Sequence, residues 1–522
     1  MGSVGAEAIG DRREHPQARF WQLDIQTVLV LVAFGIAFFL AAQPRIDVDL
    51  GWHLRTGQLI WETGAIPHSD PYSFTVNGQP WITHEWLSEV IFWPVYANWG
   101  HAGLMILCST ILTVGLWFVY RQMRDEACPR VLAALLVVLS TLTGLLIWGT
   151  RPTVFTLLLA PLFAWLLRRW SRGDNRGLWA LPPLMAVWVN LHGGYMFGLG
   201  LIAIYFFGGL AARWLPGDRP RGSLRGLAWA GAFCLLATLL NPNTYQILWY
   251  PFDTLTSEAM RKYLGDWPSP DFHAPRFWPF AAMLALFFLS AARDLRRLPI
   301  VDVLLLLALA GLGLQSNRHI PLFAVICTPV LARQLPALAE DARILAVKSG
   351  LARLWRSGNR PLRRGALLAL LNWLVLALAG ILLAAGVADS ISPQAIAQVQ
   401  DAGFPVQAVA YIKAHAIEGR IYNAYNWGGY LVLNFYPERS VFIDSRADVY
   451  RDEFIEEYLE TYYVRPNWRS TLDQHAVQYA LLEYNGPLHI LLTTSGEWRE
   501  IYSDPVAVLL ERQTPPSSGT SR

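Results

Sequence analysis

The sequence is poor in charged residues and in cysteine. Asp, Glu, Lys and Arg make up 16% of its 522 residues, against roughly 25% in soluble domains, while 54% of the residues are hydrophobic. A soluble protein of this length could not bury so much apolar surface, so we expect long lipid-facing segments. The four cysteines lie in or beside apolar runs without metal-ligand spacing, which excludes a disulfide scaffold or a zinc knuckle. A formal net charge of only +3 gives no indication of a nucleic-acid partner.

Apolar runs long enough to cross a membrane predict a polytopic α-helical membrane protein with about 11 transmembrane helices. The runs cover about residues 25–42, 103–120, 131–149, 153–167, 178–189, 193–212, 226–240, 277–292, 300–314, 320–331 and 366–387. The first run is longer than the apolar part of a usual signal peptide, and the outer loop that follows needs an anchor, so we interpret this run as a span.

The arginines predict the orientation of these spans. One set of alternate loops holds most of them, namely the N-terminal segment and residues 121–130, 168–176, 213–225, 293–297 and 333–364. By the positive-inside rule these loops and the N-terminus are cytoplasmic. Because the number of spans is odd, the chain after about Ala388 lies outside.

This topology divides the chain into a transmembrane domain (residues 1–388), an outer α/β domain (389–512) and a disordered tail (513–522). The transmembrane domain has a long first outer loop at 43–102, in which we expect interfacial helices. In the outer domain, hydrophobic periodicity predicts helices at 405–415, 452–463 and 468–475, and strands at 420–423, 441–444, 479–483, 500–503 and 506–511. Residues 334–365 are basic and amphipathic, and are expected on the cytoplasmic leaflet.

Ionisable and amide side chains gather at the outer ends of the spans. Asp47 and Asp49 come directly after the first span, where a carboxylate can act as a general base and a pair can hold a divalent cation such as Mg²⁺ or Mn²⁺. Alternatively, they are solvated carboxylates or caps of a helix that starts near Leu50. If that segment is helical, His53 is an i,i+4 neighbour of Asp49, able to tune the carboxylate or to share a metal.

The end of the same loop carries His84 and Glu85, with Glu89 one helical turn further on. His84 could supply an imidazole to the site, or the segment could be an interfacial helix with its polar face toward water. Because position 88 is Ser88, the His-Glu-x-x-His zinc pattern is absent.

Arg151, Arg318 and His319 lie where spans begin. Cationic groups there suit a phosphate at headgroup height, held by guanidinium groups and by helix N-termini, although lipid-headgroup anchoring would explain them equally well. His192, followed by two glycines, and Asn243 lie in two further outer turns and are candidate supporting residues.

Several motifs together resemble the GT-C glycosyltransferase superfamily. The motifs are the Asp-x-Asp after the first span, the segment 47–73 with Trp52-His53-Leu54, the segment 81–87 and the stretch 426–430. More narrowly, they are similar to a group of uncharacterised bacterial GT-C-like membrane proteins. The stretch around Trp427 differs from the Trp-Trp-Asp-Tyr-Gly motif of oligosaccharyltransferases, so sequon recognition is not implied.

The resemblance implies a fold, a reaction and partners. It implies transfer of a sugar from a polyprenyl-phosphate donor to a lipid, glycan or protein acceptor at the outer face of the bacterial cytoplasmic membrane. Our hypothesis is that this transfer inverts the anomeric configuration. Asp47 or Asp49 would be the base or the metal-binding carboxylate. By fold analogy, the outer domain would cover the site or select the acceptor, through Tyr422, Asn426, Trp427 and Asp444. The alternatives are an O-antigen polymerase or ligase, a transporter, and a non-catalytic scaffold.

Overall fold

The structure, a computed structural model, describes residues 23–145, 148–214, 219–263, 267–294, 298–348 and 366–513. Nearly all of the expected disordered tail, and residues 349–365 of the expected amphipathic segment, lie outside the described residues.

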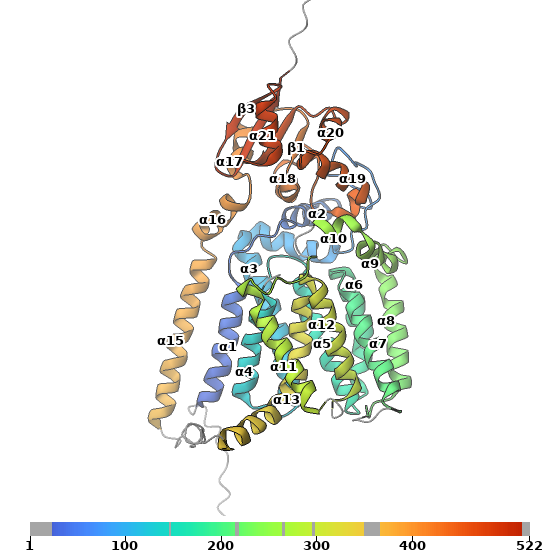
Figure 1. Cartoon of the computed structure of the whole chain (residues 1–522), viewed down its shortest axis with the longest axis vertical. Coiled ribbons are helices and arrows are strands. Elements are labelled where there is room, and N and C mark those ends of the chain that lie inside the picture. Colours follow the sequence, from blue (N-terminus) through green and yellow to red (C-terminus); the bar gives the residue numbers. More distant parts are fainter. Residues whose placement is uncertain are drawn as a thin grey trace, which may run out of the picture.

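Each apolar run coincides with a helix, and the helices stand side by side in one bundle (Figure 1). They are α1 (Ile25–Ala41), α3 (Trp86–Asp125), α4 (Arg130–Gly144), α5 (Thr153–Ser171), α6 (Leu181–Leu191), α7 (Tyr195–Ala211), α8 (Leu224–Ala237), α11 (Trp278–Asp294), α12 (Ile300–Gln315), α13 (Ile320–Lys348) and α15 (Ala366–Ser390). Short 3₁₀ turns adjoin four of them, namely η1 (Arg176–Ala180), η2 (Thr238–Leu240), η3 (Pro275–Phe277) and η5 (Asn317–His319).

Four of the described helices are long and apolar enough to cross a membrane by themselves: α3, α5, α11 extended by η3, and α15. Others are shorter because local sequence interrupts them. Two prolines occupy the first turn of α6 and separate it from η1, and α8 gives way to η2 at Thr238. The helical membrane fold is therefore confirmed, while the number of about eleven spans stays a prediction.

The bundle is held by a continuous apolar core in which Trp170, Trp188 and Phe163 are fully buried. Helices α3 and α5 approach closely at Gly115, where a Cβ atom would stand 2.4 Å from the carbonyl oxygen of Leu157. Only glycine permits that approach. Helix α15 lies at the edge of the bundle beside α1 (Figure 1).

Short helices form a layer on one end of the bundle (Figure 1). They are α2 (Leu50–Thr63), the part of α3 before its kink at Gly100, α9 (Gln246–Thr256) and α10 (Glu258–Tyr263). The first two are the helices expected in the loop at residues 43–102.

The C-terminal region lies above this layer (Figure 1) and contains a four-stranded sheet. Its strands are β1 (Ile421–Asn423), β2 (Tyr479–Glu483), β3 (Trp498–Ser503) and β4 (Ala507–Arg512), in the order β1-β2-β4-β3. Strand β1 is parallel to β2, and the other pairs are antiparallel. The helices are α16 (Pro393–Gly403), α17 (Val406–Ala414), α18 (Gly428–Phe435), α19 (Ala447–Tyr462), α20 (Trp468–Gln474) and α21 (Pro487–Thr494), with the 3₁₀ turn η7 (Tyr425–Trp427).

One expected strand is wrong. Residues 441–444 do not join the sheet, because their backbone pairs with the first loop instead. The amide of Val441 donates to the carbonyl of Tyr72, and the amide of Phe74 donates to the carbonyl of Val441. Trp52, Tyr72 and Trp81 of that loop also belong to the apolar core of the C-terminal region.

Glycines bring the C-terminal region against the residues that follow α1. A Cβ atom at Gly51 would lie 2.1 Å from the carbonyl oxygen of Gly429, and one at Gly429 would lie 2.4 Å from that of Val48. Any larger side chain would push α18 away from α2. The motif around Trp427 therefore places α18 beside the Asp-x-Asp segment.

Candidate active site

A cavity of about 440 Å³ lies where the helical bundle, the first outer loop and the C-terminal region meet. Nine of the residues expected at the site line it, although they come from segments far apart in the sequence. They are Asp47, Asp49, His53, His84, Glu85, Arg151, His192, Arg318 and Asn426.

Two carboxylates share one guanidinium group on the cavity wall. Arg151 Nη1 lies 3.3 Å from Asp47 Oδ2, and Arg151 Nη2 lies 3.3 Å from Asp49 Oδ2. Asp49 occupies the N-cap position of α2, but its side chain makes no capping hydrogen bond. The other oxygen of Asp47 accepts the backbone N–H of Asp49 at 3.0 Å. Burial, together with the neighbouring Asp47 charge, raises the pKa of Asp49 to about 7 even though Arg151 opposes that shift.

A cation at this pair would have to compete with Arg151, which already contacts both carboxylates. Within the described residues, no group of three or more His, Cys, Asp or Glu side chains is arranged to hold a metal ion.

Glu85 is the centre of a second charged group. Its carboxylate lies 3.2 Å from His84, 3.4 Å from His192 and 3.5 Å from His53. His53 is the i,i+4 neighbour of Asp49, and its backbone N–H donates to the carbonyl of Asp49 at 3.2 Å. Its imidazole contacts Glu89 at 3.1 Å as well as Glu85, and so packs against the turn that begins α3.

Burial and charge separate the pKa values of these imidazoles. Burial lowers the pKa of His53 to about 3 and that of His192 to about 4. Burial would also lower the pKa of His84, but the Glu85 carboxylate and its hydrogen bond raise it. Although burial opposes the shift, His84 and His192 lower the pKa of Glu85. The cluster thus favours an ionised Glu85 beside a protonated His84 that faces the cavity.

Arg318 lies on the cavity wall in η5, with its guanidinium 4.6 Å from the centre of the Trp267 ring. His319 does not line the cavity. Asn243 is also outside the cavity lining. Its amide donates to Asn241 Oδ1 at 2.9 Å within a buried turn.

Of the four C-terminal candidates, only Asn426 lines the cavity. The Tyr422 hydroxyl donates to the carbonyl of Tyr458 at 3.1 Å, and Trp427 Nε1 donates to that of Gly403 at 3.0 Å. Asp444 is fully buried against Arg446. These three residues hold the region together behind the cavity wall.

Arg446 is a cavity-lining residue that the sequence analysis missed. Its Nη2 lies 2.5 Å from Asp70 and 2.7 Å from Asp444, and its guanidinium lies 4.9 Å from the Tyr72 ring and 4.5 Å from the Trp81 ring. Arg446 thereby joins the first outer loop to the C-terminal region.

Ser445, Asp448 and Tyr250 also line the cavity without having been expected there. Burial raises the pKa of Asp448. The available signal was the charged stretch at 444–448 directly after the apolar residues 441–443.

The helical bundle, with its layer of short helices and a small C-terminal sheet, shares its fold with a solved oligosaccharyltransferase, as the resemblance seen in the sequence implies. No family model matches the sequence, and no curated protein matches it.

Solved structures with this fold include the archaeal oligosaccharyltransferase AglB from Archaeoglobus fulgidus in complex with an inhibitory peptide and a dolichol-phosphate. The TM-score is 0.51 at 12% identity, over 87% of this chain and 69% of AglB. ArnT from Cupriavidus metallidurans bound to undecaprenyl phosphate is also similar, with a TM-score of 0.47 at 13% identity over 93% of this chain and 97% of ArnT. At such identities the likeness to AglB concerns the fold alone.

Proposed function

We propose that this protein is a membrane glycosyltransferase that moves a sugar from a polyprenyl-phosphate donor to a lipid, glycan or protein acceptor. The observation that carries the proposal is the cavity in which Asp47 and Asp49 share Arg151 opposite further cationic groups. The fold supports it, since the similar AglB structure contains a dolichol-phosphate.

The donor phosphate would bind Arg151 and Arg318, with a protonated His84 as a third positive group. All three side chains line the same cavity, and guanidinium groups bind phosphate oxygens in pairs. Because Arg151 already contacts two carboxylates at 3.3 Å, the phosphate competes with them for it. Donor binding would then release a carboxylate from its cation and increase its basicity.

The released carboxylate, Asp47 or Asp49, would accept the proton of an acceptor hydroxyl. The hydroxyl oxygen forms a bond to the anomeric carbon as the bond from that carbon to the phosphate oxygen breaks, and the polyprenyl phosphate leaves with the electron pair. Attack from the face opposite the phosphate inverts the anomeric configuration. The cationic groups stabilise the negative charge that develops on the phosphate.

The C-terminal region would cover this site and contribute to acceptor selection through Asn426. Tyr422, Trp427 and Asp444 would act indirectly, since their hydrogen bonds hold the C-terminal region in place. We further propose that the protein resides in a bacterial cytoplasmic membrane, with the N-terminus cytoplasmic and the cavity at the outer face. Reporter fusions at the two ends of the chain test this orientation.

The decisive experiment measures sugar transfer by the full-length protein in nanodiscs, from labelled undecaprenyl-phosphate monosaccharides to a lipid extract of bacterial membranes. Asp47→Asn, Asp49→Asn and the double variant are compared with Glu62→Gln, which alters a carboxylate on the exposed end of α2. We expect loss of transfer in at least one Asp variant and none in the control. Wild-type rates in all three Asp variants would refute the mechanism.

A further inference from the structure

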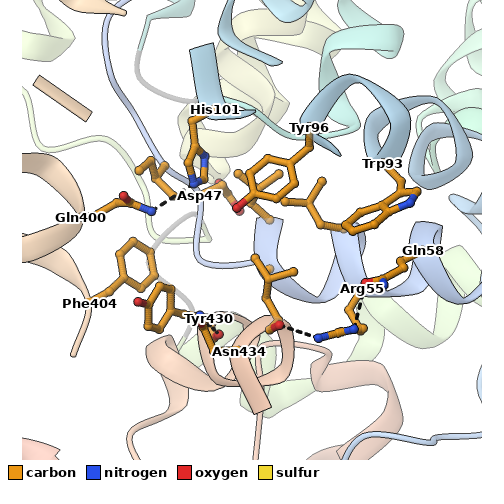
Figure 2. Close-up of a pocket in the computed structure, with 15 residues that line it drawn as sticks. Asp47, Arg55, Gln58, Trp93, Tyr96, His101, Gln400, Phe404, Tyr430 and Asn434 are labelled. Atoms are coloured by element: carbon orange, nitrogen blue, oxygen red, sulfur yellow. Dashed lines mark hydrogen bonds between the residues drawn. The ribbon is translucent and has the colours of Figure 1, made fainter. Parts of the chain in front are cut away.

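A second cavity, of about 390 Å³, lies beside the segment that joins α1 to α2 (Figure 2). Its walls come from α2, the first part of α3, the end of α16 and α18. Only Ile46 and Asp47 line both cavities, whereas Asp49 and Arg151 line the charged cavity alone. Asp47 therefore stands in the wall that separates the two spaces.

Aromatic rings form two sides of this second cavity. Trp93 and Tyr96 project from α3 on one side, while Phe404 and Tyr430 lie on the other (Figure 2). The rings of Phe404 and Tyr430 are 5.2 Å apart. Flat apolar surfaces of this kind suit the C–H faces of a sugar ring.

Three neutral amides, Gln58, Gln400 and Asn434, line this cavity beside Asp47, Arg55 and His101. Amides both donate and accept, which matches the hydroxyl groups of a sugar. Gln400 is hydrogen-bonded to His101 at 3.0 Å. Among the described residues, His101 Nδ1 and Arg55 Nε are buried polar atoms without a hydrogen-bond partner.

Arg55 is held in place by neutral oxygens. Its Nη1 donates to Gln58 at 2.8 Å, and its Nη2 donates to the carbonyl of Leu433 at 2.7 Å (Figure 2). An alkyl chain in this space would leave the amides and Arg55 facing a ligand without hydrogen-bonding groups. The lining thus favours a neutral polar ligand with apolar faces over the polyprenyl chain.

We propose that the second cavity binds a sugar of a glycan acceptor and presents one of its hydroxyl groups to Asp47. This inference rests on the proposed function and narrows it, because it names the acceptor class and assigns the base. The acceptor hydroxyl proton passes to an Asp47 carboxylate oxygen, and the hydroxyl oxygen bonds to the anomeric carbon held in the charged cavity. The bond from that carbon to phosphate breaks, and polyprenyl phosphate carries away the electron pair.

The test measures binding of maltose, cellobiose and chitobiose by saturation-transfer NMR, with the full-length protein in nanodiscs. Trp93→Ala removes one aromatic wall, and Asn434→Leu removes an amide while keeping the side-chain size. Trp99→Ala is the matched control, because Trp99 lies on the same helix but is 68% exposed and outside both cavities. We expect saturable binding of at least one disaccharide, weakened about tenfold or more by either cavity variant and unchanged by the control.

Undecaprenyl phosphate binding is measured in parallel, so that a failure of this inference can be distinguished from a failure of the proposed function. The inference predicts that both cavity variants bind undecaprenyl phosphate as the wild type does. It is overturned if no disaccharide binds, if the cavity variants and Trp99→Ala behave alike, or if Trp93→Ala weakens undecaprenyl phosphate binding, which would identify a lipid-chain site. Absence of undecaprenyl phosphate binding by the wild type would instead refute the proposed function.

Discussion

The helical bundle carries an arginine–carboxylate cluster at each end, and the two clusters differ in what surrounds them. At the end opposite the C-terminal region, Asp302 is fully buried between Arg168, at 2.5 Å, and Arg333. None of these three residues lines either of the two cavities. At the other end, Asp47 is 16% exposed, and Asp49 and Arg151 are each 21% exposed beside the charged cavity.

The comparison separates a structural ion pair from a proposed ligand site. The Asp302 cluster ties α5, α12 and α13 together, and breaking a buried pair leaves a charge without compensation. The Asp47–Asp49–Arg151 cluster has longer contacts and open space on one side, so an anionic ligand can displace a carboxylate from its arginine. Residue types alone do not distinguish the two clusters, whereas access does.

The largest effect is expected on stability. Asp302→Asn removes the buried carboxylate shared by Arg168 and Arg333 and leaves Arg168 with Glu126 at 3.9 Å, which should lower the free energy of unfolding by about 3–5 kcal/mol. Unfolding by SDS titration in mixed micelles measures this loss. Sugar transfer per folded molecule should stay at the wild-type value. A loss of transfer in the folded protein would contradict the assignment of a purely structural role to the Asp302 cluster.

Arg151→Gln should produce the opposite result. Removal of the guanidinium should reduce transfer about 100-fold, equivalent to roughly 2.7 kcal/mol in the barrier. The loss of stability should be smaller than for Asp302→Asn, because the carboxylates around Arg151 reach solvent. Wild-type turnover together with a large loss of stability would show that Arg151 forms a structural ion pair, as the arginines around Asp302 do.

Arg318→Gln should weaken undecaprenyl phosphate binding about tenfold, through loss of one charge-assisted contact. Arg276→Gln is the matched control. The guanidinium of Arg276 also lies over an aromatic ring, 5.0 Å from the centre of the Phe277 ring, but Arg276 lines neither cavity. Native mass spectrometry or thermophoresis can compare the two. Equal losses would indicate general attraction of the lipid by surface charge.

The smallest expected effect is a dependence on pH. Since its pKa is raised to about 7, Asp49 is mostly protonated at pH 6 and mostly ionised at pH 8. The ionised carboxylate binds Arg151 more strongly and therefore competes better with the donor phosphate for this guanidinium. Undecaprenyl phosphate affinity, taken relative to Asp49→Asn, should therefore fall about two- to threefold from pH 6 to pH 8. The ratio cancels the titration of the lipid phosphate itself, and a constant or rising ratio would contradict the competition for Arg151.

Sequence patterns predicted the local structure better than the long-range pairing. Each apolar run proved to be helical, and β2 has the predicted bounds, because periodicity reports burial within a segment. Residues 441–444 were misassigned because their backbone partner, near Tyr72, lies some 370 residues earlier. Arg446 was missed for the same reason, since Asp70 is 376 positions away.

The alternation of loops brought most candidate residues to one end of the bundle, but it could not set the direction of each side chain. Arg318 and His319 are adjacent in the sequence, yet only Arg318 lines the cavity. Asn243 lies in an outer turn as expected, but its amide is bonded to Asn241 within the turn. At the end of a helix, a small rotation about the helix axis decides whether a side chain enters the cavity. The spacing of residues in the sequence does not predict that rotation.

The contacts by which Arg446 joins the C-terminal region to the first outer loop have a consequence for the synthesis of the chain. Asp70 and its aromatic neighbours are synthesised near the start of the chain, whereas their arginine partner is added 376 residues later. The helical bundle can therefore be synthesised well before the cavity is complete. Under the proposed function, a nascent chain that stops before Arg446 would lack one wall of the cavity, so we expect a product truncated there to be inactive.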